Sequence, residues 1–142
     1  MSRIKIYFFI FLFTFFYTGN LFAKTNYFSE GQKLYNEKKL SKSKFKFEQD
    51  IVFNPKSEKS YLYLAKIYKE EKNDELQEQN LNAVILINPK NEEAVLLLAF
   101  LKIKKSDYKE SEKLIKNFKK ICKNLCEKNL ELIEKFKALK KE

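Results

Sequence analysis

Cys122 and Cys126 are the residues whose type and spacing point most directly to chemistry. Two thiolates without a histidine or a third cysteine supply at most half of a zinc site, and Cys-x-x-x-Cys differs from the Cys-x-x-Cys of redox motifs. One interpretation is a disulfide across the short turn between them, which an exported protein could form. The other is two free, partly buried thiols. On either interpretation we predict a structural pair, with no metal site and no catalytic residue.

The chain of 142 residues contains no histidine. This absence excludes Ser-His-Asp and Cys-His catalysis, as well as general acid–base chemistry by an imidazole. Catalysis would have to depend on carboxylates, lysine, tyrosine or the two cysteines, and no pair of these stands out in the sequence. We therefore predict a protein that is not an enzyme and that binds no cofactor.

The formal net charge is +10, yet Arg3 is the only arginine. Proteins that read nucleic-acid sequence depend on arginine for planar, bidentate contacts to guanine and phosphate. A surplus of lysine interleaved with glutamate is instead typical of a solvated helical surface. We therefore predict no specific nucleic-acid partner.

Residues 1–23 have the pattern of a secretory signal peptide. Arg3 and Lys5 form a basic start, and an apolar run follows from Ile6 to Tyr17. This run of about 12 residues is too short to span a bilayer, which takes roughly 20 helical residues. We expect cleavage after Ala23, and the alternative is an uncleaved signal anchor. Both interpretations predict export to the periplasm or cell envelope.

The rest of the chain predicts helices. Its 44% hydrophobic and 34% charged residues suffice for a core, while two glycines and two prolines leave almost no turns for a β-hairpin fold. We therefore predict one all-α domain.

A fixed period organises these helices. The phrases Asn54-Pro55 and Asn88-Pro89 lie 34 residues apart (89 − 55), and residues of similar kind recur at the same interval. They are an aromatic residue at Tyr27 and Tyr61, a small residue at Gly31, Ala65 and Ala99, and an apolar residue at Phe47, Leu81 and Ile115. Such a period marks stacked helix hairpins that cannot bury their apolar faces alone.

This set of residues resembles the tetratricopeptide repeat (TPR) family. The resemblance implies an α-solenoid of antiparallel helix hairpins, with repeats at residues 24–57, 58–91 and 92–125. A capping helix would follow at residues 126–142. In that helix, Leu130, Ile133, Phe136 and Leu139 are expected to form one apolar stripe that covers the end of the stack.

The resemblance also implies a concave groove, lined by the first helices, that binds an extended peptide or a helix of a partner. The groove residues carried over are Phe28, Gln32, Tyr35 and Asn36 in the first repeat, Leu62, Lys66 and Lys69 in the second, and Leu96, Phe100, Ile103 and Lys104 in the third. An alternative for Phe28, Leu62 and Leu96 is packing between neighbouring helices. Phe100 and Ile103 are expected to be exposed contacts.

One variant of the family holds C-terminal chaperone tails with a clamp of Lys, Asn and Arg. Phe28 and Gln32 stand in place of the first pair here, and Glu93 and Leu97 in place of the last. That specificity is therefore not predicted.

Together these features predict a non-enzymatic scaffold or adaptor in an envelope assembly, with a protein partner in the groove. An alternative is a basic surface protein that associates with anionic lipid or cell-wall polymer. Its lysine-rich faces would include Lys135, Lys137, Lys140 and Lys141 at the C-terminus. Salt separates the two, because exposed charges are screened within about 8 Å at physiological ionic strength, whereas apolar contacts persist.

Overall fold

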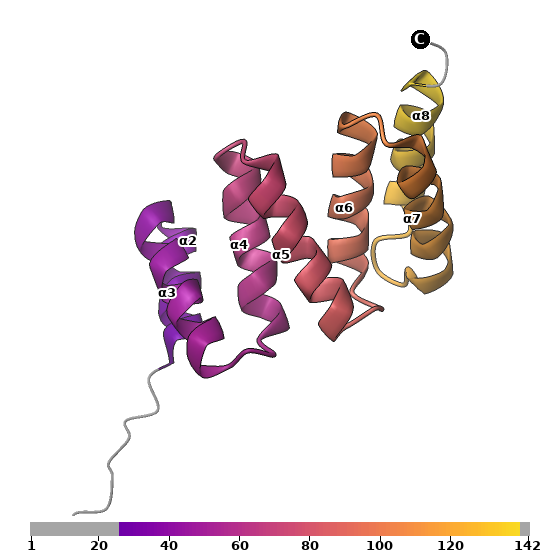
Figure 1. The fold of residues 1–142 in the computed structure, drawn as a ribbon. Helices are drawn as coiled ribbons and strands as arrows, with labels where there is room; N and C mark the ends of the chain where they lie inside the picture. Colours follow the sequence, from indigo (N-terminus) through magenta and orange to yellow (C-terminus); the bar gives the residue numbers. More distant parts are fainter. Residues whose placement is uncertain (1–25, 140–142) are drawn as a thin grey trace, which may run out of the picture.

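The structure, a computed structural model, describes residues 26–139 (Figure 1). The predicted signal segment, residues 1–23, lies outside the described residues, as do Lys140 and Lys141. Every described element is a helix: α2 (Tyr27–Asn36), α3 (Leu40–Phe53), α4 (Glu58–Glu70), α5 (Asp74–Ile87), α6 (Glu92–Lys104), α7 (Tyr108–Ile121) and α8 (Lys128–Leu139). None of these helices is long and apolar enough to cross a membrane. The all-α prediction is confirmed.

The helices form three antiparallel pairs, α2–α3, α4–α5 and α6–α7, and α8 follows the last pair (Figure 1). Between the pairs, α2 contacts α4, and α6 contacts the capping helix α8. Helices α3 and α5 contact the first helix of the next pair, α4 and α6. The first helices therefore line the inner, concave side, and α3, α5 and α7 lie along the outer side. This arrangement is the predicted α-solenoid.

The turn inside each helix pair is the same structure three times. Lys38, Lys72 and Ser106, each 34 residues after the last, have positive φ angles of 60°, 57° and 56°. In each turn the N–H of the next residue donates to a carbonyl in the last turn of the first helix, at 2.9 Å. This Schellman arrangement satisfies carbonyls that a helix end leaves unpaired. The period read from the sequence is thus present in the backbone.

Side-chain caps begin most of the helices. Asn73, Asn91 and Asp107 each accept a hydrogen bond from the backbone N–H three residues on, at 3.1, 2.8 and 3.2 Å. Such caps satisfy donors that have no partner within the helix. Ser57 occupies the cap position of α4, but its hydroxyl donates to the Asp50 carboxylate instead. Asp50 therefore ties the end of α3 to the start of α4.

The two helices of the first pair cross at Gly31. A Cβ at this position would lie 2.8 Å from Cε1 of Phe47, whose side chain is fully buried. The Ser43 hydroxyl, also buried, donates to the Gly31 carbonyl at 2.8 Å. Ala65 and Ala99 are fully buried at the same place in the next two pairs, as the period predicted.

The capping helix differs from its prediction. It begins at Lys128, and it turns Leu132 into the core while Leu130 is 71% exposed. Phe136, which follows Leu132 by four residues or about one helical turn, packs against the same core. Placing Leu130 on the buried stripe was therefore wrong, because the buried face is centred on Leu132 and Phe136.

Candidate functional site

A pocket of about 610 Å³ opens on the concave side of the array. Four apolar residues of α6 line it, namely Leu97, Phe100, Leu101 and Ile103. Lys69 of α4, Asp74 and Gln77 of α5, Lys104 of α6, and Glu131, Lys135 and Ala138 of α8 complete the lining. The capping helix thus supplies one wall of the pocket, in addition to closing the stack.

Most of the charges around this pocket are paired. Lys104 lies 2.7 Å from Asp74, and Lys135 lies 3.0 Å from Glu131 while its Nζ stands 4.8 Å from the centre of the Phe100 ring. Lys69 is exposed and forms no ion pair with any described residue. The pocket therefore combines an apolar lining with one surplus positive charge.

Gln77 is the polar residue inside this pocket. It is only 4% exposed, and its side-chain amide hydrogen-bonds to no residue that the structure describes. In the part of the chain that the structure describes, the buried side-chain atoms without a hydrogen-bond partner are Gln49 Oε1 and Asn129 Oδ1, so the Gln77 amide reaches the water of the open pocket and can bond to a ligand there. Gln77 was not among the predicted groove residues, because it belongs to a second helix.

Nearer the N-terminus, the predicted groove residues gather around Tyr63. The rings of Phe28 and Tyr35 lie 5.9 and 5.1 Å from that of Tyr63, and Gln32 donates to the Tyr63 hydroxyl at 2.9 Å. The Nζ of Lys66 lies 5.0 Å from the Tyr63 ring and 2.7 Å from Glu93. These side chains are already engaged with one another, so this part of the concave surface is polar-aromatic and has few unpaired groups.

Tyr35 makes a further contact at the edge of this group. Its hydroxyl donates to Glu70 at 3.2 Å, and burial, followed by the charge of Glu70, raises the pKa of Tyr35. Tyr63 itself was missed by the sequence analysis. The 34-residue period aligns it with Ser29 and Leu97, so no recurring aromatic residue marked the position.

Some of the predicted groove residues pack inside the protein, and others remain accessible to a ligand. Leu62 and Leu96 are buried in the core, which is the packing alternative given for them, and Phe28 packs against Phe47 and Tyr63. Ile103 was expected to be exposed, and this was wrong: its side chain is 5% exposed because it also packs into the α6 core. Phe100 is half-buried, and Asn36 and Lys69 are exposed.

A network of ion pairs braces α6 against α5. Lys102 lies 2.6 Å from Glu78 and 3.6 Å from Asp107, and Lys105 lies 2.7 Å from Glu78. The hydrogen bonds from Lys102 and then Lys105 lower the pKa of Glu78, and the bond to Glu78 raises the pKa of Lys102. This network fixes the helix that supplies the apolar core of the pocket lining.

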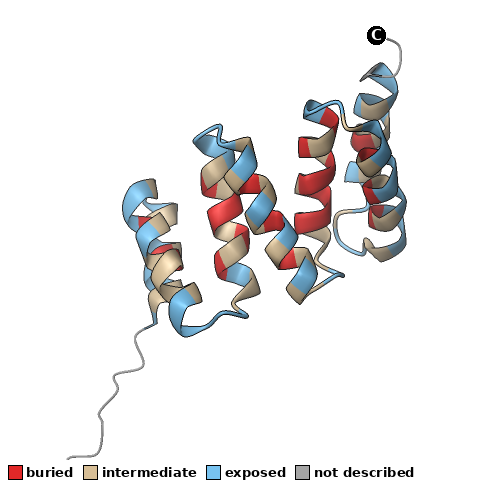
Figure 2. Cartoon of the chain, in the orientation of Figure 1, coloured by how far each residue is buried: buried red, intermediate tan, exposed pale blue. Residues whose placement is uncertain are grey.

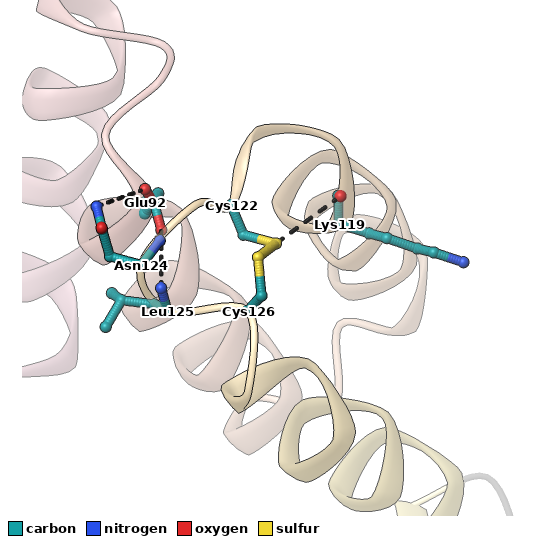
Figure 3. The surroundings of a disulfide bond; sticks show 6 residues. All are labelled: Glu92, Lys119, Cys122, Asn124, Leu125 and Cys126. Atoms are coloured by element: carbon teal, nitrogen blue, oxygen red, sulfur yellow. Dashed lines mark hydrogen bonds between the residues drawn. A yellow bond between two sulfur atoms is a disulfide. The ribbon is translucent and has the colours of Figure 1, made fainter.

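Cys122 and Cys126 form a disulfide in the structure, with Cα atoms 5.2 Å apart (Figure 3). The loop between them is held by Glu92 at the start of α6, whose carboxylate accepts from the backbone N–H groups of Asn124 and Leu125, both at 3.0 Å. Backbone hydrogen bonds from this loop, that of Lys123 first, lower the pKa of Glu92. The loop thus fixes the position from which α8 starts.

No group of three or more His, Cys, Asp or Glu that could hold a metal occurs in the described part of the chain.

Solved structures with the same fold are TPR domains. The first TPR domain of Spaghetti (RPAP3), bound to the HSP90 peptide SRMEEVD, matches with a TM-score of 0.71 and 17% identity over 80% of this chain and 90% of that one. This chain has the fold of a TPR domain.

Two further TPR domains support the assignment. The Sgt2 domain from Aspergillus fumigatus gives a TM-score of 0.68 at 17% identity, over 82% of this chain and 80% of that one. The OM64 domain from Arabidopsis gives 0.67 at 21% identity, over 81% and 92%. No protein-family model and no curated protein matches the sequence. The TPR-like fold predicted from the spacing is therefore confirmed through structure.

Proposed function

We propose that this TPR-like protein is a non-enzymatic interaction scaffold that binds a segment of a partner protein, an extended peptide or a helix, in its concave groove. The pocket beside Phe100 carries the proposal, because it joins an apolar lining to the unpaired amide of Gln77 and the surplus charge of Lys69. A segment that fits has an apolar side chain for the pocket and a negative charge near Lys69. The peptide bound by the RPAP3 domain supports this use of the fold.

The acidic tail of that HSP90 peptide is not the ligand we propose. Gln32 is bound to Tyr63, and Glu93 brings a negative charge to the groove, where it pairs with Lys66. A carboxylate clamp needs free cationic and amide groups at such places. The apolar anchor therefore contributes more of the affinity than the charge does.

We place this activity in the cell envelope, as part of a larger assembly. The support is the pattern of residues 1–23 together with a cysteine pair that suits an oxidising compartment. Cell fractionation tests this point: the protein is expected with the envelope or periplasm, and recovery with the cytoplasm contradicts it.

The binding proposal is tested by crosslinking the tagged full-length protein in intact cells and purifying it in moderate salt. Wild-type protein is expected to retain a discrete partner protein, and Phe100→Lys is expected to lose it. Leu130→Lys is the matched control, because it puts a lysine in place of an exposed apolar side chain that lies outside the pocket lining. Equal capture by wild type and Phe100→Lys, with both variants folded by circular dichroism, would exclude the pocket as the binding site.

A further inference from the structure

The outer side of the array carries exposed apolar side chains that the groove does not use. Phe45 and Val52 of α3 and Leu86 of α5 are 57%, 73% and 86% exposed. Val52 and Leu86 occupy the same place in successive helix pairs, 34 residues apart (86 − 52). We call these three residues the apolar row. Exposed apolar side chains that recur at one position of the repeat are available to an interaction surface on the outer side.

The same outer side becomes basic on α7. Lys109, Lys113, Lys116 and Lys120 follow at intervals of four, three and four residues, which places them along one face of the helix. All four are exposed, and they line an open trough of about 480 Å³. Lys120 lies 34 residues after Leu86, at the place that the apolar row occupies in the first two pairs. We call these four residues the lysine stripe.

Nearby carboxylates neutralise only part of the lysine stripe. Lys113 pairs with Glu110 at 3.2 Å and Lys116 with Glu112 at 3.0 Å, with the lysine side chains still 76% and 70% exposed. Lys109 and Lys120 form no ion pair with any described residue, and the same is true of Lys119, exposed beside them. The outer face of α7 therefore keeps a positive charge that a negative surface can neutralise.

We propose that the apolar row and the lysine stripe together form a face that binds an anionic phospholipid membrane. Lysines near such a surface are attracted to its negative potential, and apolar side chains gain by entering the interfacial region. A soluble polyanion would use the lysine stripe but would gain nothing from Phe45, Val52 and Leu86. The membrane is for this reason the occupant that accounts for both features.

This surface is independent of the proposed groove. The apolar row and the lysine stripe lie on second helices, whereas the pocket is lined mainly by first helices and α8 (Figure 1). A protein bound to a membrane by its outer side leaves the pocket open to a partner. Loss of one activity therefore need not affect the other.

The test is co-sedimentation with vesicles of phosphatidylcholine containing about one third phosphatidylglycerol. Residues 24–142, the chain without its predicted signal segment, are used because they contain every described helix. Binding is expected at low salt and not to vesicles of phosphatidylcholine alone. Glutamate at all four positions of the lysine stripe is expected to weaken binding by about 100-fold or more. Serine at all three positions of the apolar row is expected to weaken it by about 10-fold and to leave it salt-sensitive.

The matched control makes the same change of net charge elsewhere. Glutamate at Lys33, Lys38, Lys69 and Lys72, all exposed on first helices or their turns, is expected to retain most of the binding. Thermal unfolding followed by circular dichroism establishes that every variant is folded. The proposal is overturned if wild type does not bind the anionic vesicles, or if the control loses as much as the lysine-stripe variant. Serine variants that bind as wild type, with polyphosphate competing fully, would make the partner a soluble polyanion instead.

Discussion

The first helix pair and the third share one fold but are held together by different side chains. Helix α2 buries only Gly31, whereas α6 buries seven residues between Ala94 and Ile103 (Figure 2). Aromatic rings join the first pair to the second, with Phe47 stacked on Tyr63 at 4.9 Å. Mainly aliphatic side chains fill the third pair, together with the buried ring of Phe118 on α7, and α8 covers its end.

This difference explains where the pocket lies. Around Tyr63, hydroxyl and amide groups bond to each other, and the rings fill the space between α2 and α4. On α6, the aliphatic side chains turn inward, and Phe100 remains half-buried beside the wall that α8 provides. The same groove is therefore closed by contacts within the protein at one end and open to a ligand at the other.

The largest expected effect concerns the one large side chain that α3 buries fully. Phe47→Ala is expected to lower the free energy of unfolding by about 3–5 kcal/mol. Because Phe47 belongs to the cluster of the first two pairs, hydrogen exchange should accelerate in α2 and α3 while α6 and α7 remain protected. Phe45→Ala, two residues away and exposed, is the control and should change the stability by about 0.5 kcal/mol or less. Uniform loss of protection along the chain would contradict the comparison.

The second effect concerns the covered end of the array. Replacing Cys122 and Cys126 by serine is expected to cost about 2 kcal/mol, the chain-entropy value for so short a loop. Urea unfolding of the variant and of reduced wild type should give the same lower stability. Compared with the oxidised wild type, the serine variant should exchange its amide hydrogens faster in α8, the helix that follows the loop. Equal stability of the oxidised and reduced proteins would show that the pair does not brace this end.

Gly31→Ala tests the crossing of α2 and α3. Alanine in a helix is normally favoured over glycine by about 1 kcal/mol. Here the added methyl group would meet the buried Phe47 ring at 2.8 Å, and overpacking of this kind costs about 1–3 kcal/mol. We expect Gly31→Ala to lower the free energy of unfolding, measured with urea, by about 1 kcal/mol. A gain in stability would mean that the helices can separate at this point, and that the first pair is looser than described.

The smallest effect depends on pH and concerns α6. Since the pKa of Glu78 is lowered in the folded protein by Lys102 and Lys105, its ionised form stabilises the fold at neutral pH. This contribution is complete above the ordinary carboxyl pKa and disappears as the pH falls below the lowered one. Glu78→Gln should therefore cost about 1 kcal/mol at pH 7 and nothing near pH 2, as measured by urea unfolding. Lys102→Met should weaken the same pH dependence, and a cost that is equal at both pH values would contradict the ion-pair network.

The sequence predicted the fold well because its signals are periodic. Pro55, Pro89 and the small residues at the helix crossings recur every 34 residues, and each has a local physical cause in a turn or a close contact. The site was harder to predict. Ile103 and Phe100 are both apolar residues of α6, and which of them faces the core depends on how α8 packs. Tyr63 carried no periodic signal. Gln77 stood in the period with Ser43 and Ser111, as a larger residue at a small crossing position, so only the structure placed it in the pocket.

The most direct test of the binding account is site-specific photocrosslinking in living cells. The photoreactive amino acid p-benzoylphenylalanine replaces Phe100 in the pocket and, as the control, Gln79, which is exposed on the outer face of α5. The account predicts a discrete protein adduct from position 100 and none from position 79. No adduct at position 100, or the same adduct at both positions, would contradict the conclusion that the concave pocket holds the partner.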